Sequence, residues 1–138
     1  MMVNQDPQPE VFTTTFENIN YANATSVTNV IYTHQGHAEQ VLIYAIGVDV
    51  TVSADGSSAN LRDFDITITA GANNVPSNPF DGGAIFDSRD KVISFSCPIV
   101  VNFKQPLQVK LTIPNHTSGG DTVDVEVRLI GETSILKR

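Results

Sequence analysis

The chain has 138 residues, which is enough for one domain with its own hydrophobic core. Since 41% of the residues are hydrophobic and 17% are charged, the composition is not that of a disordered chain. Its net charge of −7 is uneven, because no Lys or Arg precedes Arg62, so the first 61 residues carry −6 and the rest carry −1. A nucleic-acid binder needs a basic stripe, and an anionic membrane surface would repel this charge, so neither partner is expected.

The N-terminal residues have neither the basic cluster nor the apolar run of a signal peptide, which predicts folding in a cytoplasm. The longest apolar run is far short of the ~20 residues that a membrane helix needs. Cys97 is the single cysteine, so no intramolecular disulfide is possible. Since no basic residue adjoins its thiol, we interpret Cys97 as a small buried hydrophobe.

An arm over residues 1–10, with Pro7 and Pro9, precedes a chain whose hydrophobic residues recur with a period of two. This pattern predicts strands over residues 11–17, 25–33, 40–53 and 61–69. After a loop over residues 70–83, further strands are predicted over 84–87, 91–96, 99–104, 107–113 and 123–129. The folded domain is expected to cover residues 11–131, and a tail covers residues 132–138.

About eight strands with one apolar face each must bury those faces by packing sheet on sheet. We therefore predict an all-β fold, an antiparallel β-sandwich with the topology of an eight-stranded jelly roll and an extended N-terminal arm. An immunoglobulin-like sandwich is the alternative, but the chain has no Trp and no cysteine pair to support it. Cys97-Pro98 predicts a bulge, a bend or an edge position, because proline donates no ladder hydrogen bond.

Candidate catalytic groups are the carboxylate pairs Asp63/Asp65 and Asp124/Glu126 and the loop histidines, which are His34, His37 and His116. Paired carboxylates can serve glycoside hydrolysis or metal binding. Both pairs, however, alternate with core positions, which is typical of a solvated strand surface. The histidines lack further ligands near them in sequence. We predict no enzyme, no metal and no cofactor, because catalysis would require these groups to converge in one cleft.

One strand is apolar on both of its faces. In residues 40–53, the side chains assigned to the core begin with Leu42 and Tyr44, yet Val41, Ile43 and Ala45 on the opposite face are apolar as well. A solvent-facing sheet surface is not normally built this way. Either the arm or the 70–83 loop covers these residues, or Val41, Ile43 and Ala45 form an interface between subunits.

The polar, Pro-containing arm, the Thr/Asn/Val-rich strand 25–31 and the alternating segments 106–113 and 121–130 resemble viral jelly-roll structural proteins. More narrowly, they resemble the small decoration or cement proteins of tailed-phage capsids. The resemblance covers most of the chain but lies in the general character of these segments and not in a diagnostic motif. No site residue of the family is therefore assigned to a position in this chain. The resemblance implies a non-enzymatic homo-oligomer, often a trimer, whose arm bridges subunits of the major capsid protein. The location it implies is the virion surface, after assembly in the host cytoplasm.

A different class of function is a carbohydrate- or receptor-binding module that uses the 70–83 loop. The side chains of Asn73, Asn74, Asn78 and Asp81 would hydrogen-bond sugar hydroxyls, and Phe80 would stack on a sugar ring. Sugar-binding platforms usually present several exposed aromatic rings. The chain has only 7% aromatic residues and no Trp, so this reading stays the alternative.

Overall fold

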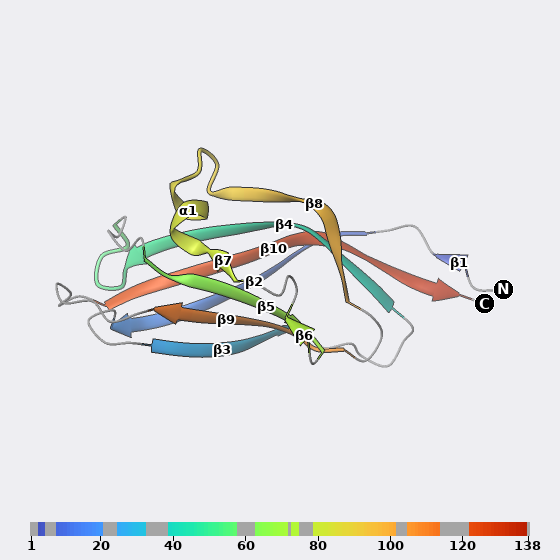
Figure 1. Ribbon diagram of the computed structural model, residues 1–138, viewed down its shortest axis with the longest axis horizontal. Helices are drawn as coiled ribbons and strands as arrows, with labels where there is room; N and C mark the ends of the chain where they lie inside the picture. The colour runs from blue at the N-terminus through green and yellow to red at the C-terminus, as the bar shows by residue number, and fades with distance from the viewer. Residues whose placement is uncertain are drawn as a thin grey trace.

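The computed structural model describes residues 3–4, 8–20, 25–32, 39–57, 63–71, 73–74, 79–101, 105–113 and 122–137. They form two antiparallel five-stranded sheets stacked as a sandwich, with one short helix (Figure 1). The first sheet contains β1 (Val3–Asn4), β2 (Gln8–Asn20), β4 (Glu39–Val52), β8 (Val92–Val101) and β10 (Thr122–Lys137). The second contains β3 (Thr25–Tyr32), β5 (Asp65–Ala70), β6 (Asn73–Asn74), β7 (Phe80–Asp81) and β9 (Leu107–Ile113). The all-β antiparallel sandwich predicted from the sequence is confirmed.

The strand pairs are nested within one another along the chain. β2 pairs with β10, β3 with β9, β4 with β8, and β5 with β7. Successive pairs alternate between sheets, so that β2–β10 and β4–β8 lie in one sheet, and β3–β9 and β5–β7 lie in the other. A long antiparallel hairpin wound in this way is a jelly roll.

The space between the sheets is filled by one cluster of apolar side chains. Alternation builds it, since Leu107, Val109 and Leu111 of β9 are fully buried and the residues between them face outward. Phe16 of β2 and Phe64 are the largest of its fully buried side chains. Because this interior is packed, the edges and outer faces of the sandwich are the surfaces open to contact.

A β-bulge at Tyr44 inverts the alternation of β4. Ile130 pairs with Ala45 and the next residue, Gly131, pairs with Ile43, so Tyr44 is left out of the register with β10. Val41 and Ile43 point into the core before the bulge, whereas Ile46, Val48 and Val50 do so after it. The prediction that Leu42 and Tyr44 share the core face with Ile46 was therefore wrong, since one extra residue moves the following side chains to the other face.

Residues 84–87, predicted as a strand, form part of the helix α1 (Gly82–Asp87). The Asp81 carboxylate starts this helix by accepting a hydrogen bond of 3.1 Å from the backbone N–H of Ala84. Ile85 and Phe86 are buried, and α1 packs against β4 and β5 (Figure 1). The predicted 70–83 loop also contains regular structure, because β6 and β7 both pair with β5.

The two ends of the chain lie side by side beyond one end of the sandwich (Figure 1). β1 pairs with the end of β10, with Val3 opposite Lys137, and β2 already begins at Gln8. The predicted boundaries of the arm at residue 10 and of the tail at residue 132 thus fall inside strands β2 and β10. The arm and tail segments that are described belong to the first sheet.

Candidate assembly surfaces

Most sheet edges of the described chain carry features that hinder pairing with a further strand. β2 contains Pro9, Glu10 and Glu17, and its register with β10 is interrupted near Asn18, which has a φ of 54°. β8 contains Pro98, while β6 and β7 are two residues long each. Proline, edge charges, bulges and very short strands all protect an edge against unwanted pairing.

The edge strand β3 lacks most of these protections, apart from a shift in its register with β9 between Val30 and Tyr32, at the end of the strand. Its sequence, Thr-Ser-Val-Thr-Asn-Val-Ile-Tyr, contains no charged residue, no proline and no glycine. Among the described strands it pairs with β9 only, and Val30 on it is 58% exposed. The side-chain amide nitrogen (Nδ2) of Asn29 donates a 2.9 Å hydrogen bond to the Thr14 hydroxyl of β2, which joins the two sheets at this side. A long, uncharged, β-prone edge of this kind is a template for another strand.

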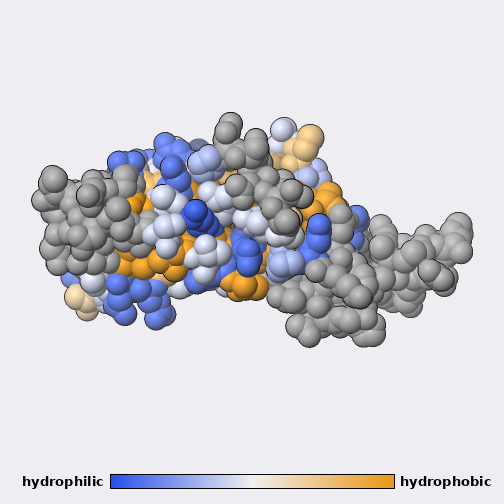
Figure 2. Space-filling model, turned by 60° about the horizontal axis from the view of Figure 1, so that its bottom comes forward, coloured by the Kyte–Doolittle hydropathy of each residue, from blue (hydrophilic) through white to orange (hydrophobic). Residues whose placement is uncertain are grey.

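Strands β3 and β9 also lack carboxylates in an otherwise acidic protein. β3 and β9 together contain no Asp or Glu and a single cation, Lys110. This side of the molecule comes forward in Figure 2, where weakly polar and hydrophilic side chains surround smaller hydrophobic areas. A second acidic molecule can approach here with less repulsion than at the carboxylate-bearing strands.

A second irregularity shapes the edge strand β8. Ile99 pairs with Ile43 and Ser94 pairs with Ala45, so residues 95–98 lie opposite Tyr44 alone and β8 bends (Figure 1). This confirms the bulge and the edge position predicted at Cys97-Pro98. The prediction of a buried Cys97 was wrong, because the bulge leaves this residue exposed.

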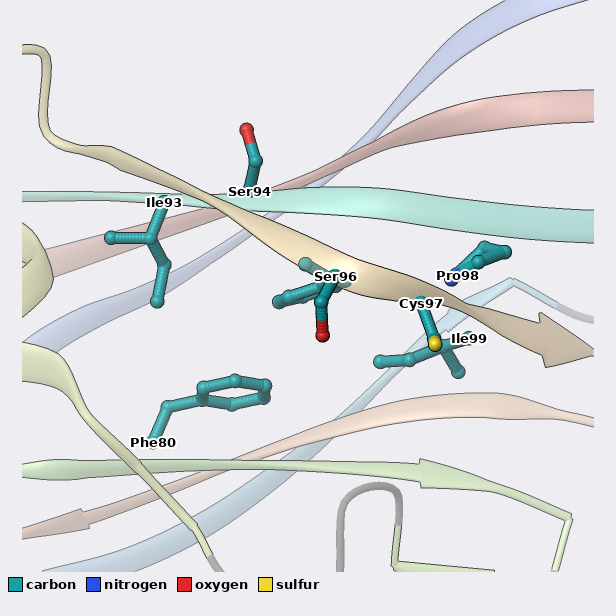
Figure 3. Close-up of a pocket in the computed structure, with 8 residues that line it drawn as sticks. Phe80, Ile93, Ser94, Ser96, Cys97, Pro98 and Ile99 are labelled. Carbon is teal, nitrogen blue, oxygen red and sulfur yellow. The ribbon is translucent and has the colours of Figure 1, made fainter.

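The bend of β8 opens a groove of about 430 Å³ beside Phe80 (Figure 3). Ile93, Ser96 and Ile99 point toward the side on which Phe80 lies, whereas Ser94 points away from it. The rings of Phe80 and Phe95 are stacked, with centroids 5.4 Å apart and an angle of 21° between their planes. Of the residues that the structure describes, residues 93–99 of β8 and Phe80 line the groove, and none of these side chains is charged.

The predicted interface residues do not share one surface. Val41 and Ile43 are fully buried in the core, and Ala45 is 7% exposed. The bulge explains this, because it turns Val41 and Ile43 inward and leaves Tyr44 outside. The assignment of Val41 and Ile43 to an outer face was therefore wrong. A contact between subunits through this sheet stays a prediction, and the apolar side chains exposed there are Val11 at 57%, Val100 at 41% and Tyr44 at 39%.

The residues predicted for a sugar-binding loop have largely structural positions. Asn73 and Asn74 pair with Ala70 and Thr69 of β5, while Phe80 is half-buried against Phe95. Asp81 caps α1. Asn78 lies outside the described residues, as do His34, His37 and His116.

The two carboxylate pairs lie on different sheets. On β10, Asp124 accepts hydrogen bonds of 2.9 Å from the backbone N–H of Asn18 and 2.7 Å from the Ser53 hydroxyl, which lower the pKa of Asp124. Glu126 is 3.3 Å from the Arg128 guanidinium. On β5, burial and then the neighbouring charges of Asp81 and Asp63 raise the pKa of Asp65. Within the described ranges, no three His, Cys, Asp or Glu side chains are placed to hold a metal ion.

We expect Asp65→Asn to stabilise the protein at neutral pH. The pKa of Asp65 is raised above its ordinary value of 3.8, so unfolding becomes easier as the pH rises through the folded-state pKa. The variant should increase the free energy of unfolding by roughly 0.5 kcal/mol at pH 7, allowing for solvent screening. At low pH, where Asp65 is protonated in both the folded and the unfolded protein, it should have no such effect.

Asp124→Asn is the matched control for Asp65→Asn and should act in the opposite direction. Its lowered pKa means that Asp124 stabilises the fold above pH 3.8 and loses this effect as the pH falls through the folded-state value. Thermal unfolding of both variants at several pH values measures the two effects. If both substitutions changed the free energy of unfolding in the same direction at neutral pH, the two carboxylates would not have the opposite environments described here.

Among the described residues, no helix combines the length and hydropathy that crossing a membrane requires. No protein-family model matches the sequence, and no curated protein sequence matches it.

Similar arrangements of strands are found in several solved structures. A structure of Desmodium yellow mottle tymovirus has a TM-score of 0.38 and 8% identity over 98% of this chain and 90% of the other. The decameric BFDV capsid protein has a TM-score of 0.34 and 10% identity over 98% and 99%. Latent PorU from Porphyromonas gingivalis has a TM-score of 0.34 and 12% identity over 93% of this chain and 13% of that one. The first of these structures is of a virus and the second is of a capsid protein.

Proposed function

We propose that this protein is a structural component of a virion. The observation that carries the proposal is the open β3 edge of a jelly roll whose interior is filled by its own core. With its interior packed, the described domain offers edges and outer faces for contact, and jelly rolls with these surfaces are used in viral shells. The acidic surface suits a position on the outside of a shell, away from the packaged nucleic acid.

In its narrower form, the proposal is that the protein decorates or cements a tailed-phage shell as a homotrimer and binds the major capsid protein. The paired chain ends, β1 with the end of β10, extend beyond the sandwich and offer a segment to reach a neighbouring subunit (Figure 1). The exposed Val11, Tyr44 and Val100 on the first sheet offer apolar contact between copies.

Analysis of particles purified from the native source tests the proposal. We expect the protein in density-banded particles, in a fixed molar ratio to the major shell protein, by quantitative mass spectrometry. Mild denaturant then separates two roles, since a decoration protein is released from an intact shell and a shell-building subunit is not. Absence of the protein from purified particles would overturn the proposal.

A further inference from the structure

We infer that the free edge of β3 pairs with β3 of a second copy of this chain, which joins the two second sheets into one continuous sheet. The inference rests on the proposed function in one respect, that a virion component meets many copies of itself. It names the strand through which two of those copies meet. The following observations come from the described residues alone.

β3 is eight residues long, and among the described strands it pairs with β9 only, so no described strand lies along its other side. β9 occupies the paired side from Thr25 opposite Ile113 to Tyr32 opposite Leu107, with a shift in register after Val30. An unpaired strand edge offers a row of N–H and C=O groups that another extended strand can satisfy. The remaining edges of the described sheets carry proline, charge or only two residues, whereas the irregularity of β3 lies at its end, so β3 is the edge best suited to accept a strand.

Charge favours a second copy as the occupant of this edge. Two chains of net charge −7 repel each other, and that repulsion is weakest where neither presents a carboxylate. β3 carries no charge, and β9 beside it carries only Lys110. Two β3 strands therefore meet without opposing like charges along the strand itself, which cross-strand pairing would otherwise penalise.

Symmetry and side-chain direction also fit a pair of β3 strands. A two-fold axis perpendicular to the sheet makes the two strands antiparallel and keeps the outer face of both copies on the same side. In any register, the exposed Val30 of each copy then lies beside an uncharged residue of the other copy, because β3 contains no charged residue. The pair is closed, since each β3 edge satisfies the other and no open edge of this strand remains.

The full chain and two variants test this contact. Val30→Lys places on β3 the kind of charge that protects natural edges, at a position 58% exposed and therefore tolerant of substitution. Thr15→Lys is the matched control, because Thr15 is likewise uncharged and exposed and lies on β2, the edge strand of the other sheet. Contacts through other surfaces affect the wild-type protein and Val30→Lys alike, so the comparison isolates β3.

Sedimentation velocity over a concentration series gives the readout. We expect the wild type and Thr15→Lys to associate beyond 14.9 kDa with similar midpoints, and Val30→Lys to need at least about a tenfold higher concentration. High ionic strength should strengthen association of the wild type, because salt screens the repulsion between acidic chains. A strictly monomeric wild type, or equal midpoints for wild type and Val30→Lys, would overturn the inference.

The result is independent of the particle analysis that tests the proposed function. If the protein is present in particles but Val30→Lys associates like the wild type, the function stands and the β3 contact fails. If Val30→Lys is impaired and the protein is absent from particles, the contact stands and the virion role fails. Hydrogen exchange adds a local readout, since amides of residues 25–32 should become slower with concentration in the wild type and not in Val30→Lys.

Discussion

Gly131→Ala should lower the free energy of unfolding by about 3 kcal/mol and the midpoint of thermal unfolding by about 10 °C. Gly131 is buried in β10, opposite Ile43, where the bulge at Tyr44 brings the backbone of β4 close. A Cβ at residue 131 would overlap the carbonyl oxygen of Leu42 and lie 2.9 Å from its carbonyl carbon. Because the obstacle is backbone, the strands must move apart, and the register that places Val41 and Ile43 in the core would be disturbed.

Gly47→Ala in the paired strand β4 is the control for Gly131→Ala. A Cβ at residue 47 would meet the side chains of Arg128 and Val92 at 3.2 Å, and the long Arg128 side chain can shift. The expected loss is below about 1 kcal/mol. Equal losses for the two alanine variants, measured by chemical and thermal unfolding, would show that the close approach at the bulge is not what constrains residue 131.

The strands with regular pairing could be predicted from the sequence. In β9, Leu107, Val109 and Leu111 alternate with outward residues, and all three are fully buried. The alternation is visible because residues 107–112 of β9 each have one partner on β3 and one on β5, apart from the shift on β3 between Val30 and Tyr32. The antiparallel sandwich followed from several such segments.

The bulges and the short helix could not be predicted in this way. Tyr44 adds one residue to β4, so a single alternation over the whole strand assigns Val41 and Ile43 to the wrong face. The six residues of α1 are too few to show a helical period, although Asp81 before Gly82-Gly83 is an N-cap signal. Cys97 is exposed because residues 95–98 have only Tyr44 opposite them, a feature of pairing between distant segments.

The open β3 edge, too, could be predicted from the sequence only in part. That residues 25–32 lack charge, proline and glycine is visible in the sequence. That this strand is at an edge follows only from the order of strands in the second sheet, where β9 lies between β3 and β5. Candidate assembly surfaces therefore depend on which strands are neighbours, whereas the fold class depends on the pattern within each strand.

Gly82→Ala should destabilise the protein by about 3 kcal/mol, because α1 begins directly against the core residue Phe64. Gly82 is buried, its backbone N–H donates a 2.9 Å hydrogen bond to the Phe64 carbonyl, and a Cβ there would overlap the Phe64 ring. The ring is 1% exposed and packed in the core, so it has no free space into which to turn. Either the helix start moves away from β5 or the ring is displaced.

A double-mutant cycle with Phe64→Leu tests this contact. Phe64→Leu alone should cost roughly 1.5 kcal/mol, because it removes ring atoms and leaves space beside Gly82. The added methyl group of Gly82→Ala can occupy part of that space, so the double variant should be more stable than the sum of the single effects predicts, by about 1 kcal/mol or more. Strict additivity in urea unfolding would mean that the methyl group and the ring do not meet, and that α1 rather than the ring absorbs the change.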